Sequence, residues 1–265
     1  MTDPRPIGIF DSGIGGLTVL AALQRRLPGE RYIYLGDTAR LPYGMKSAET
    51  VVRYALRAAE FLAAHGIKML VVACNTASAA ALPALEEAMT VPVIGVVGPG
   101  ARVAVAGTAG RVGIIGTEST IASGAYLRAV RALRPEVEVV ARACPLFVPL
   151  AEEGWWDHPV TREVARLYLE PFAGGRVDTL VLGCTHYPLL QPAIAATLGP
   201  GVRLVDSAEA VAGEVEALVA QQALASSDGA GLRLLVTDAA ARLTRLAKLI
   251  LPGTAVSLEL VDLPD

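Results

Sequence analysis

The sequence has few cysteines, no long apolar run and no basic excess. Its three cysteines are an odd number in a chain of 265 residues, which argues against a disulfide framework and for a reducing compartment. No apolar stretch reaches the roughly 18–20 residues that a membrane-spanning helix needs. The polar, proline-containing start, Met1 to Pro6, does not resemble a signal peptide. We therefore expect a cytoplasmic protein that has no membrane partner.

Signals for nucleic acids, metals and nucleotides are also lacking. The 23 basic and 26 acidic residues give a net charge of −3, and no long basic run indicates a nucleic-acid partner. Neither Cys74 nor Cys184 has the C-x-x-C partner of a zinc site. The glycine-rich segment 13–16 does not fit the dinucleotide fingerprint and has no Walker lysine; a flexible or tightly packed turn explains it equally well. We expect no metal and no other cofactor.

What the sequence does have is an alternation of short apolar runs and longer Ala/Leu/Arg-rich stretches. Near-continuous apolar runs are typical of parallel strands buried on both faces. Helical stretches lie between them, such as Ala48–Ala64, with Ser47 as N-cap and Gly66 just beyond its end. This alternation predicts an α/β fold with doubly wound parallel sheets. The expected strands are Ile7–Phe10, Arg31–Leu35, Met69–Ala73, Val93–Val96, Val112–Ile115, Val137–Ala141, Thr179–Leu182 and Arg203–Val205.

A weak internal repeat divides the chain into two similar halves. The first strand leads into Asp11-Ser12-Gly13, and the strand Val112–Ile115 leads into Gly116-Thr117. Roughly 65–70 residues after each start, a strand ends in a matching turn. These turns are Cys74-Asn75-Thr76 and Cys184-Thr185-His186. We expect two pseudo-symmetric domains with the active site in the cleft between them.

The repeat also predicts the domain boundaries. Residues 1–97 and 208–265 would form the first domain, which supplies Cys74, and residues 98–207 the second, which supplies Cys184. The chain would cross over near Gly95–Gly100 and return at Asp206-Ser207. The elements of the tail would then pack on the first domain; they are a helix near Glu209–Gln222, a strand at Leu232–Thr237 and a helix near Ala239–Leu251.

The paired cysteines suggest acid/base chemistry. Ligands of open α/β sheets bind at the carboxyl ends of strands, and two facing domains would bring both cysteine turns into one cleft. One thiolate and one thiol on opposite walls could remove a proton from one face of an amino acid's α-carbon and deliver another to the opposite face, which racemises it without a cofactor. We expect each cysteine to follow a strand and to open a helix, where the positive end of the helix dipole favours a thiolate.

Polar neighbours could assist this chemistry, but each has a structural alternative. Asp11 could approach Cys74, and His186 lies two residues after Cys184. A single cysteine is often an inert core residue, which is what we expect of Cys144. Asp11-Ser12-Gly13 and Asn75-Thr76 could be only a turn and a helix cap. Amide and hydroxyl groups that could hold substrate carboxylates belong to Ser12, Asn75, Thr76 and Thr185.

Five motifs, in this order along the chain, strongly resemble the glutamate racemase family, with the match running from about Ile7 to Ser207. They are Gly8-Ile9-Phe10-Asp11-Ser12-Gly13-Ile14-Gly15-Gly16-Leu17-Thr18-Val19, Tyr34-Leu35-Gly36-Asp37-Thr38, Pro42-Tyr43-Gly44, Ala73-Cys74-Asn75-Thr76-Ala77-Ser78 and Leu182-Gly183-Cys184-Thr185-His186-Tyr187-Pro188-Leu189.

The resemblance implies interconversion of L- and D-glutamate without pyridoxal phosphate, for peptidoglycan synthesis, by a homodimer. It implies that Cys74 acts on D-glutamate and Cys184 on L-glutamate, with Asp11 and His186 as their auxiliary partners. Glu152 would orient the histidine, although the adjacent Glu153 could take that role instead. The positions implied for substrate binding are Asp11, Ser12, Pro42, Tyr43, Gly44, Asn75, Thr76, Thr117, Thr185 and His186.

Two alternatives stay open at this point. An aspartate racemase, or a racemase of a related amino acid, would share the fold and the two cysteines but need a shorter pocket. A non-catalytic amino-acid-binding protein could use the same cleft, although retention of Cys74, Cys184, Asp11 and His186 speaks against it.

Overall fold

The strands that the structure describes form two separate parallel sheets. The structure is a computed structural model that describes residues 3–222, 224–225, 229–238 and 241–263. The six-stranded sheet has the order β10-β9-β2-β1-β3-β4, and the four-stranded sheet has the order β6-β5-β7-β8. The first contains β1 (Ile7–Asp11), β2 (Arg31–Gly36), β3 (Met69–Val72), β4 (Val93–Gly95), β9 (Gly231–Val236) and β10 (Leu258–Leu260); the second contains β5 (Arg111–Gly116), β6 (Glu138–Ala143), β7 (Thr179–Gly183) and β8 (Arg203–Asp206).

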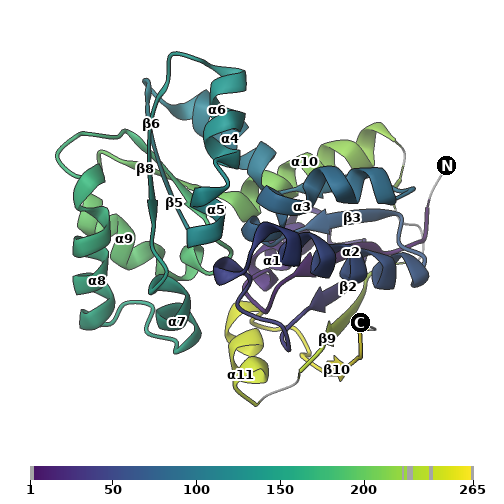
Figure 1. The fold of residues 1–265 in the computed structure, drawn as a ribbon. Helices are drawn as coiled ribbons and strands as arrows, with labels where there is room; N and C mark the ends of the chain where they lie inside the picture. Colours follow the sequence, from purple (N-terminus) through teal and green to yellow (C-terminus); the bar gives the residue numbers. More distant parts are fainter. Residues whose placement is uncertain (1–2, 223, 226–228, 239–240, 264–265) are drawn as a thin grey trace.

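The two sheets repeat one topology. The order β2-β1-β3-β4 in the larger sheet has the same sequence of connections as β6-β5-β7-β8 in the smaller. Cys74 follows β3 and Cys184 follows β7, so the two cysteine turns occupy equivalent places in the two halves. The predicted fold class, two pseudo-symmetric doubly wound parallel sheets, is confirmed. Figure 1 shows the halves side by side, with β2, β9 and β10 in the half of the larger sheet and β5, β6 and β8 in the other.

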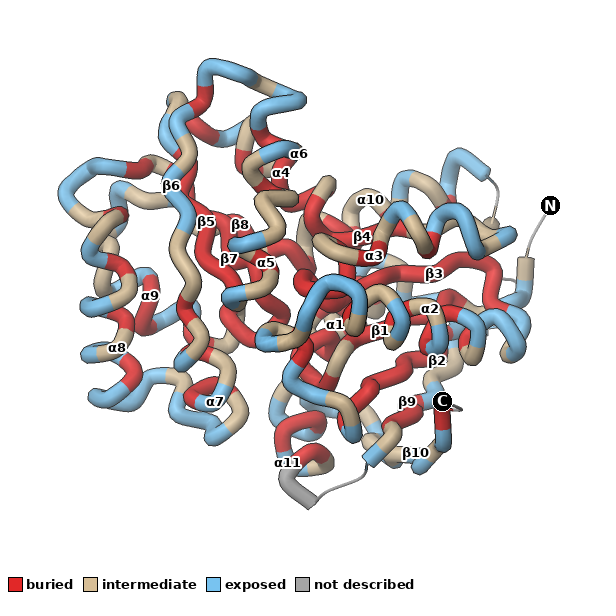
Figure 2. Tube along the Cα trace, viewed as in Figure 1, coloured by how far each residue is buried: buried red, intermediate tan, exposed pale blue. Residues whose placement is uncertain are grey.

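Burial follows the apolar runs of the sequence. β1, β3 and β7 are buried along their whole lengths, as expected for strands covered on both faces. β6 differs, because it lies at the edge of the smaller sheet and its residues are exposed or half-buried (Figure 2). Apolar clusters fill both faces of each sheet.

Helices connect the strands and cover the sheets. The predicted helix Ala48–Ala64 is confirmed with both of its bounds: the Ser47 hydroxyl accepts from the Thr50 amide at 3.3 Å, and Gly66 takes a φ of +71°, which favours glycine. The helices are α1 (Leu17–Arg26), α2 (Ala48–Ala64), α3 (Asn75–Ala88), α4 (Val97–Gly107), α5 (Glu118–Ala122), α6 (Ala125–Leu133), α7 (Phe147–Glu152), α8 (Pro159–Leu169), α9 (Gln191–Leu198), α10 (Ser207–Gln221) and α11 (Ala241–Ile250), with 3₁₀ turns η1 (Tyr43–Met45), η2 (Glu170–Phe172) and η3 (Tyr187–Leu190). None of the described helices is long and apolar enough to cross a membrane.

The tail returns to the larger sheet, as predicted. The chain crosses to the smaller sheet between β4 and α4 and comes back between β8 and α10. α10 packs on α1, and β9 pairs with β2. Of the helix expected at 239–251, residues 239–240 lie outside the described residues. The domain boundaries at 97/98 and 207/208 stay a prediction.

Candidate active site

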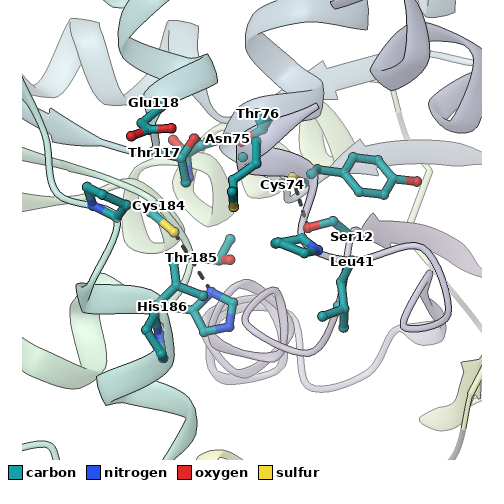
Figure 3. Close-up of a pocket in the computed structure, with 18 of the residues that line it drawn as sticks. Ser12, Leu41, Cys74, Asn75, Thr76, Thr117, Glu118, Cys184, Thr185 and His186 are labelled. Carbon is teal, nitrogen blue, oxygen red and sulfur yellow. Dashed lines mark hydrogen bonds between the residues drawn. The ribbon is translucent and has the colours of Figure 1, made fainter. Parts of the chain in front are cut away.

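A cavity of about 390 Å³ lies where the carboxyl ends of the two sheets meet. Twelve of the predicted site residues line it: Ser12, Pro42, Tyr43, Gly44, Cys74, Asn75, Thr76, Thr117, Glu152, Cys184, Thr185 and His186. Figure 3 shows Cys74 and Cys184 on opposite sides of the cavity. Asp11 is the exception, because it is fully buried behind the lining.

Cys74 is held at the start of a helix. It is the N-cap of α3, and its Sγ accepts a hydrogen bond from the Ala77 amide at 3.5 Å. The thiol in turn donates to the Ser12 hydroxyl at 3.3 Å (Figure 3). The prediction that this cysteine opens a helix is confirmed. Burial, with the nearby charge of Asp11, nevertheless raises the pKa of Cys74 to about 12, so the thiol keeps its proton at neutral pH.

Asp11 links the two halves behind Cys74. Its Oδ2 accepts from the Gly13 amide at 2.9 Å, and its Oδ1 accepts from the Thr185 hydroxyl of the other half at 3.5 Å. Burial raises the pKa of Asp11, although the charge of His186 and the amide donors oppose the rise. A buried carboxyl with a raised pKa can exchange a proton with its surroundings nearer neutral pH than an exposed one.

Cys184, His186 and Glu152 form a chain of acid/base groups on the opposite wall. Cys184 Sγ lies 3.8 Å from His186 Nδ1, and His186 Nε2 lies 3.2 Å from Glu152 Oε1. Burial alone would lower the pKa of His186, but its interactions with Cys184 and Glu152 prevail and raise the pKa to about 10. The imidazole is therefore charged at neutral pH. Glu153 is exposed and does not line the cavity.

The prediction that Cys184 opens a helix is wrong. The chain after Cys184 makes a turn into η3, and α9 begins only at Gln191. A short 3₁₀ turn lacks the aligned peptide dipoles of a full helix. The positive charge beside Cys184 is instead that of His186, so the two cysteines occupy equivalent places in the topology but different electrostatic surroundings.

Hydroxyl groups from both halves meet at one wall of the cavity. Thr76 Oγ1, at the start of α3, lies 3.0 Å from Thr117 Oγ1 at the end of β5. Thr120 completes a ring, at 3.2 Å from Thr76 and 2.9 Å from Thr117. Such hydroxyls can reorient to donate to a carboxylate.

Tyr43 anchors a loop that forms another wall. Its hydroxyl donates to the buried Asp37 carboxylate at 2.6 Å. The other oxygen of Asp37 accepts from Thr237, at the end of β9, at 3.0 Å. The C-terminal part of the chain therefore braces the segment that carries Pro42 and Gly44 into the cavity.

Sequence reasoning missed eight lining residues: Gly13, Leu41, Met45, Glu118, Pro145, Leu146, Val148 and Pro149. Four of these, Pro145, Leu146, Val148 and Pro149, come shortly after the end of β6, so the rule that ligands bind at the carboxyl ends of strands could have found them. Met45 and Leu146 are largely exposed apolar residues at the rim of the cavity, and no chemistry-bearing group marks them in the sequence.

The arrangement can transfer protons on two faces of a small ligand. Each wall carries a thiol with its own acid/base neighbour, and amide and hydroxyl groups surround the space between them. Within the part of the chain that the structure describes, no three His, Cys, Asp or Glu side chains are grouped to hold a metal ion.

Comparisons with known proteins agree with this arrangement. The Asp/Glu/Hydantoin racemase family model matches residues 16–215. The chain is 58% identical over 209 residues to a glutamate racemase of Geobacter metallireducens, covering 78% of this chain and 77% of the relative. It is 49% identical to a glutamate racemase of Chlorobium phaeobacteroides, covering 98% and 97% of the two chains. The crystal structure of a Francisella tularensis glutamate racemase in complex with D-glutamate superposes with a TM-score of 0.93 at 37% identity, covering 98% of each chain.

Proposed function

The chain belongs to the Asp/Glu/Hydantoin racemase family, among the glutamate racemases, and from this premise we propose that it interconverts L- and D-glutamate with Cys74 and Cys184 as its two acid/base groups. The observation that carries the proposal is the placement of the two thiols, which lie on opposite sides of one cavity at equivalent points of the two halves (Figure 3). The Francisella tularensis relative, whose structure contains D-glutamate, supports glutamate as the substrate.

In the L-to-D direction, the Cys184 thiolate takes the α-proton of L-glutamate. The electron pair of the broken C–H bond stays on the α-carbon and spreads into the α-carboxylate. The Cys74 thiol then delivers its proton to the opposite face, which forms the new C–H bond of D-glutamate. The turnover leaves Cys184 as a thiol and Cys74 as a thiolate, and the D-to-L direction runs through the same steps in reverse.

The charges around the two thiols suit the first of these proton-transfer steps. The charged His186 lies beside Cys184, the base of the first step, whereas the raised pKa of Cys74 keeps that thiol protonated. The protonated Cys74 is thus ready to serve as the acid in the L-to-D direction. Glu152 helps to keep His186 charged. Asp11 and Ser12 are placed to assist the transfer of the Cys74 proton.

Substrate binding uses the polar groups that surround the thiols. We propose that the carboxylates of glutamate accept hydrogen bonds from Ser12, Asn75, Thr76, Thr117 and Thr185, all of which line the cavity. Hydrogen bonds to the α-carboxylate also stabilise the charge that it gains when the α-proton leaves.

The reaction would supply D-glutamate for the peptidoglycan of the cell wall. A homodimer, a cytoplasmic location and the absence of nucleic-acid partners stay predictions, as do the two domain boundaries. The boundaries follow from the internal repeat, and the other predictions follow from the resemblance or from composition.

The proposal is tested by incubating the reduced, folded protein with L-glutamate in D₂O, with L-aspartate as a parallel sample. We expect loss of optical rotation together with α-deuteration of glutamate only. Turnover of aspartate instead of glutamate would make the protein an aspartate racemase. No exchange with either amino acid would leave a binding protein as the better interpretation.

A further inference from the structure

A buried tyrosine from one half holds an amide at the cavity of the other. Asn75, the first residue of α3, lines the cavity and is 2% exposed. Tyr126 of α6 donates its hydroxyl proton to Asn75 Oδ1 at 2.6 Å. The tyrosine is itself buried and does not line the cavity. This hydrogen bond therefore connects the smaller-sheet half to the amide beside Cys74.

The hydrogen bond fixes which end of the amide is used. A primary amide has an acceptor oxygen on one side and a donor nitrogen on the other, so occupying the oxygen of Asn75 leaves the nitrogen to face elsewhere. Asn75 Nδ2 is buried and has no hydrogen-bond partner among the residues that the structure describes. A buried donor without an acceptor is unfavourable to maintain, which points to a ligand that supplies the acceptor.

The position of Tyr126 is itself determined by two glycines. A β-carbon at Gly100 would lie 3.3 Å from Tyr126 Cε1, and one at Gly183 would lie 3.2 Å from Tyr126 Cε2. The ring thus lies between α4 and the end of β7 in space that larger residues would take. Burial also raises the pKa of Tyr126, so its hydroxyl keeps the proton that it donates to Asn75.

We propose that Tyr126 is a positioning residue, which fixes the Asn75 amide so that its NH₂ group donates to a carboxylate oxygen of the substrate. The inference rests on the proposed function, because it needs a carboxylate ligand in this cavity. Tyr126 touches no substrate itself and acts only through Asn75.

The test is a double-mutant cycle with Tyr126→Phe and Asn75→Ala, read as KM and kcat for L-glutamate. Tyr126→Phe keeps the buried ring and removes only the hydroxyl. We expect it to raise KM about tenfold, the size of one net hydrogen bond, and to change kcat much less. In the Asn75→Ala background it should have no further effect on KM, because the group through which it acts is gone.

Two more variants make the test specific. Tyr32→Phe is the control, because it also removes a buried hydroxyl. Tyr32 lies at the amino-terminal end of β2, and its hydroxyl donates to the carbonyls of Leu23 and Leu27. The KM of this variant should equal that of the wild type. Asn75→Asp places an oxygen where the amide nitrogen lies, so it should raise KM more than Asn75→Ala does.

The outcomes distinguish a failure of the positioning role of Tyr126 from a failure of the proposed racemase function. Additive effects of Tyr126→Phe and Asn75→Ala on KM, or a fall in kcat alone, would overturn the positioning role while the wild type stays active. If the wild type and Tyr32→Phe both fail to racemise glutamate, the proposed function itself fails and this inference fails with it.

Discussion

Gly15 passes so close to Thr185 that a β-carbon built on it would lie 2.4 Å from the threonine hydroxyl and 2.6 Å from His186 Nδ1. The glycine-rich turn after β1 therefore serves the close approach of the other half's cysteine turn. This explains a motif that fits no nucleotide-binding pattern. Gly16 also permits a close approach, here within its own half, since a β-carbon on it would lie 2.5 Å from Asp11 Cβ.

Gly15→Ala is expected to displace Thr185 and His186 and with them the Cys184 wall. Overpacking of this kind costs about 1–3 kcal/mol of stability, and a misplacement of about 1 Å at a reacting group can lower kcat about 100-fold. The control is Gly29→Ala, because no atom lies within 4 Å of a β-carbon there. Equal kcat values for the two variants would show that the close approach does not matter to the site.

The Glu152 carboxylate is expected to set the alkaline limit of the reaction in the L-to-D direction. His186 must be charged to stabilise the Cys184 thiolate, and Glu152 is one of the groups that raise its pKa to about 10. Removing the negative charge lowers the pKa of His186, so the charge is lost at a lower pH. In Glu152→Gln the basic limb of kcat/KM against pH should therefore move to lower pH.

Glu153→Gln is the matched control for this profile, because Glu153 is adjacent in sequence but exposed and outside the cavity lining. Its profile should overlay that of the wild type. A shift in Glu153→Gln with none in Glu152→Gln would reverse the assignment.

The two cysteines are expected to act on different enantiomers. Serine does not ionise near neutral pH. Cys74→Ser and Cys184→Ser should therefore each lower the rate of racemisation about 1000-fold, within the range for removal of an acid/base group. In D₂O, Cys184→Ser should still exchange the α-proton of D-glutamate without inversion, and Cys74→Ser that of L-glutamate. NMR of the α-position measures both.

Cys144→Ala serves as the control for these variants, because Cys144 is buried in the core and does not line the cavity. It should retain racemase activity. The assignment of faces is wrong if both serine variants exchange the same enantiomer.

Lys68 is expected to be essential to stability although it lies far from the chemistry. Its buried ammonium contacts Glu30 Oε2 at 2.6 Å and the carbonyls of Asp3 at 3.0 Å and Leu224 at 2.5 Å. Lys68→Met leaves a buried carboxylate without this partner, which typically costs about 3–5 kcal/mol. Arg57→Ala, which breaks an exposed pair with Glu60, should cost less than about 1 kcal/mol. Urea unfolding measures both, and equal losses would contradict the expectation.

Patterns with a direct physical cause could be predicted from the sequence. The apolar runs predicted the strands from β1 to β8. The runs are most continuous in β1, β3 and β7, because parallel strands buried on both faces exclude polar residues. Ser47 and Gly66 predicted both ends of α2, because caps act locally. The rule that ligands bind at the carboxyl ends of strands predicted that the two cysteine turns meet.

Features that depend on tertiary contacts could not be predicted. The hydrogen bond from Tyr126 to Asn75 joins residues 51 positions apart, and neither residue signals the other in sequence. The strand-to-helix pattern after Cys184 predicts a helix that begins at the cysteine, but η3 intervenes. The short strand β10 is also not predicted. Among the described strands it pairs only with β9, and its Leu258-Glu259-Leu260 segment has no long apolar run.

The most direct test of the two-thiol mechanism is the isotopic content of both enantiomers when the wild type acts on L-glutamate in D₂O at low conversion. Because the proton taken by Cys184 and the one given by Cys74 are different, the D-glutamate formed should carry deuterium at the α-carbon, while the remaining L-glutamate keeps its hydrogen. D-Glutamate that retains the original α-hydrogen would mean that one base serves both faces, and it would contradict the account.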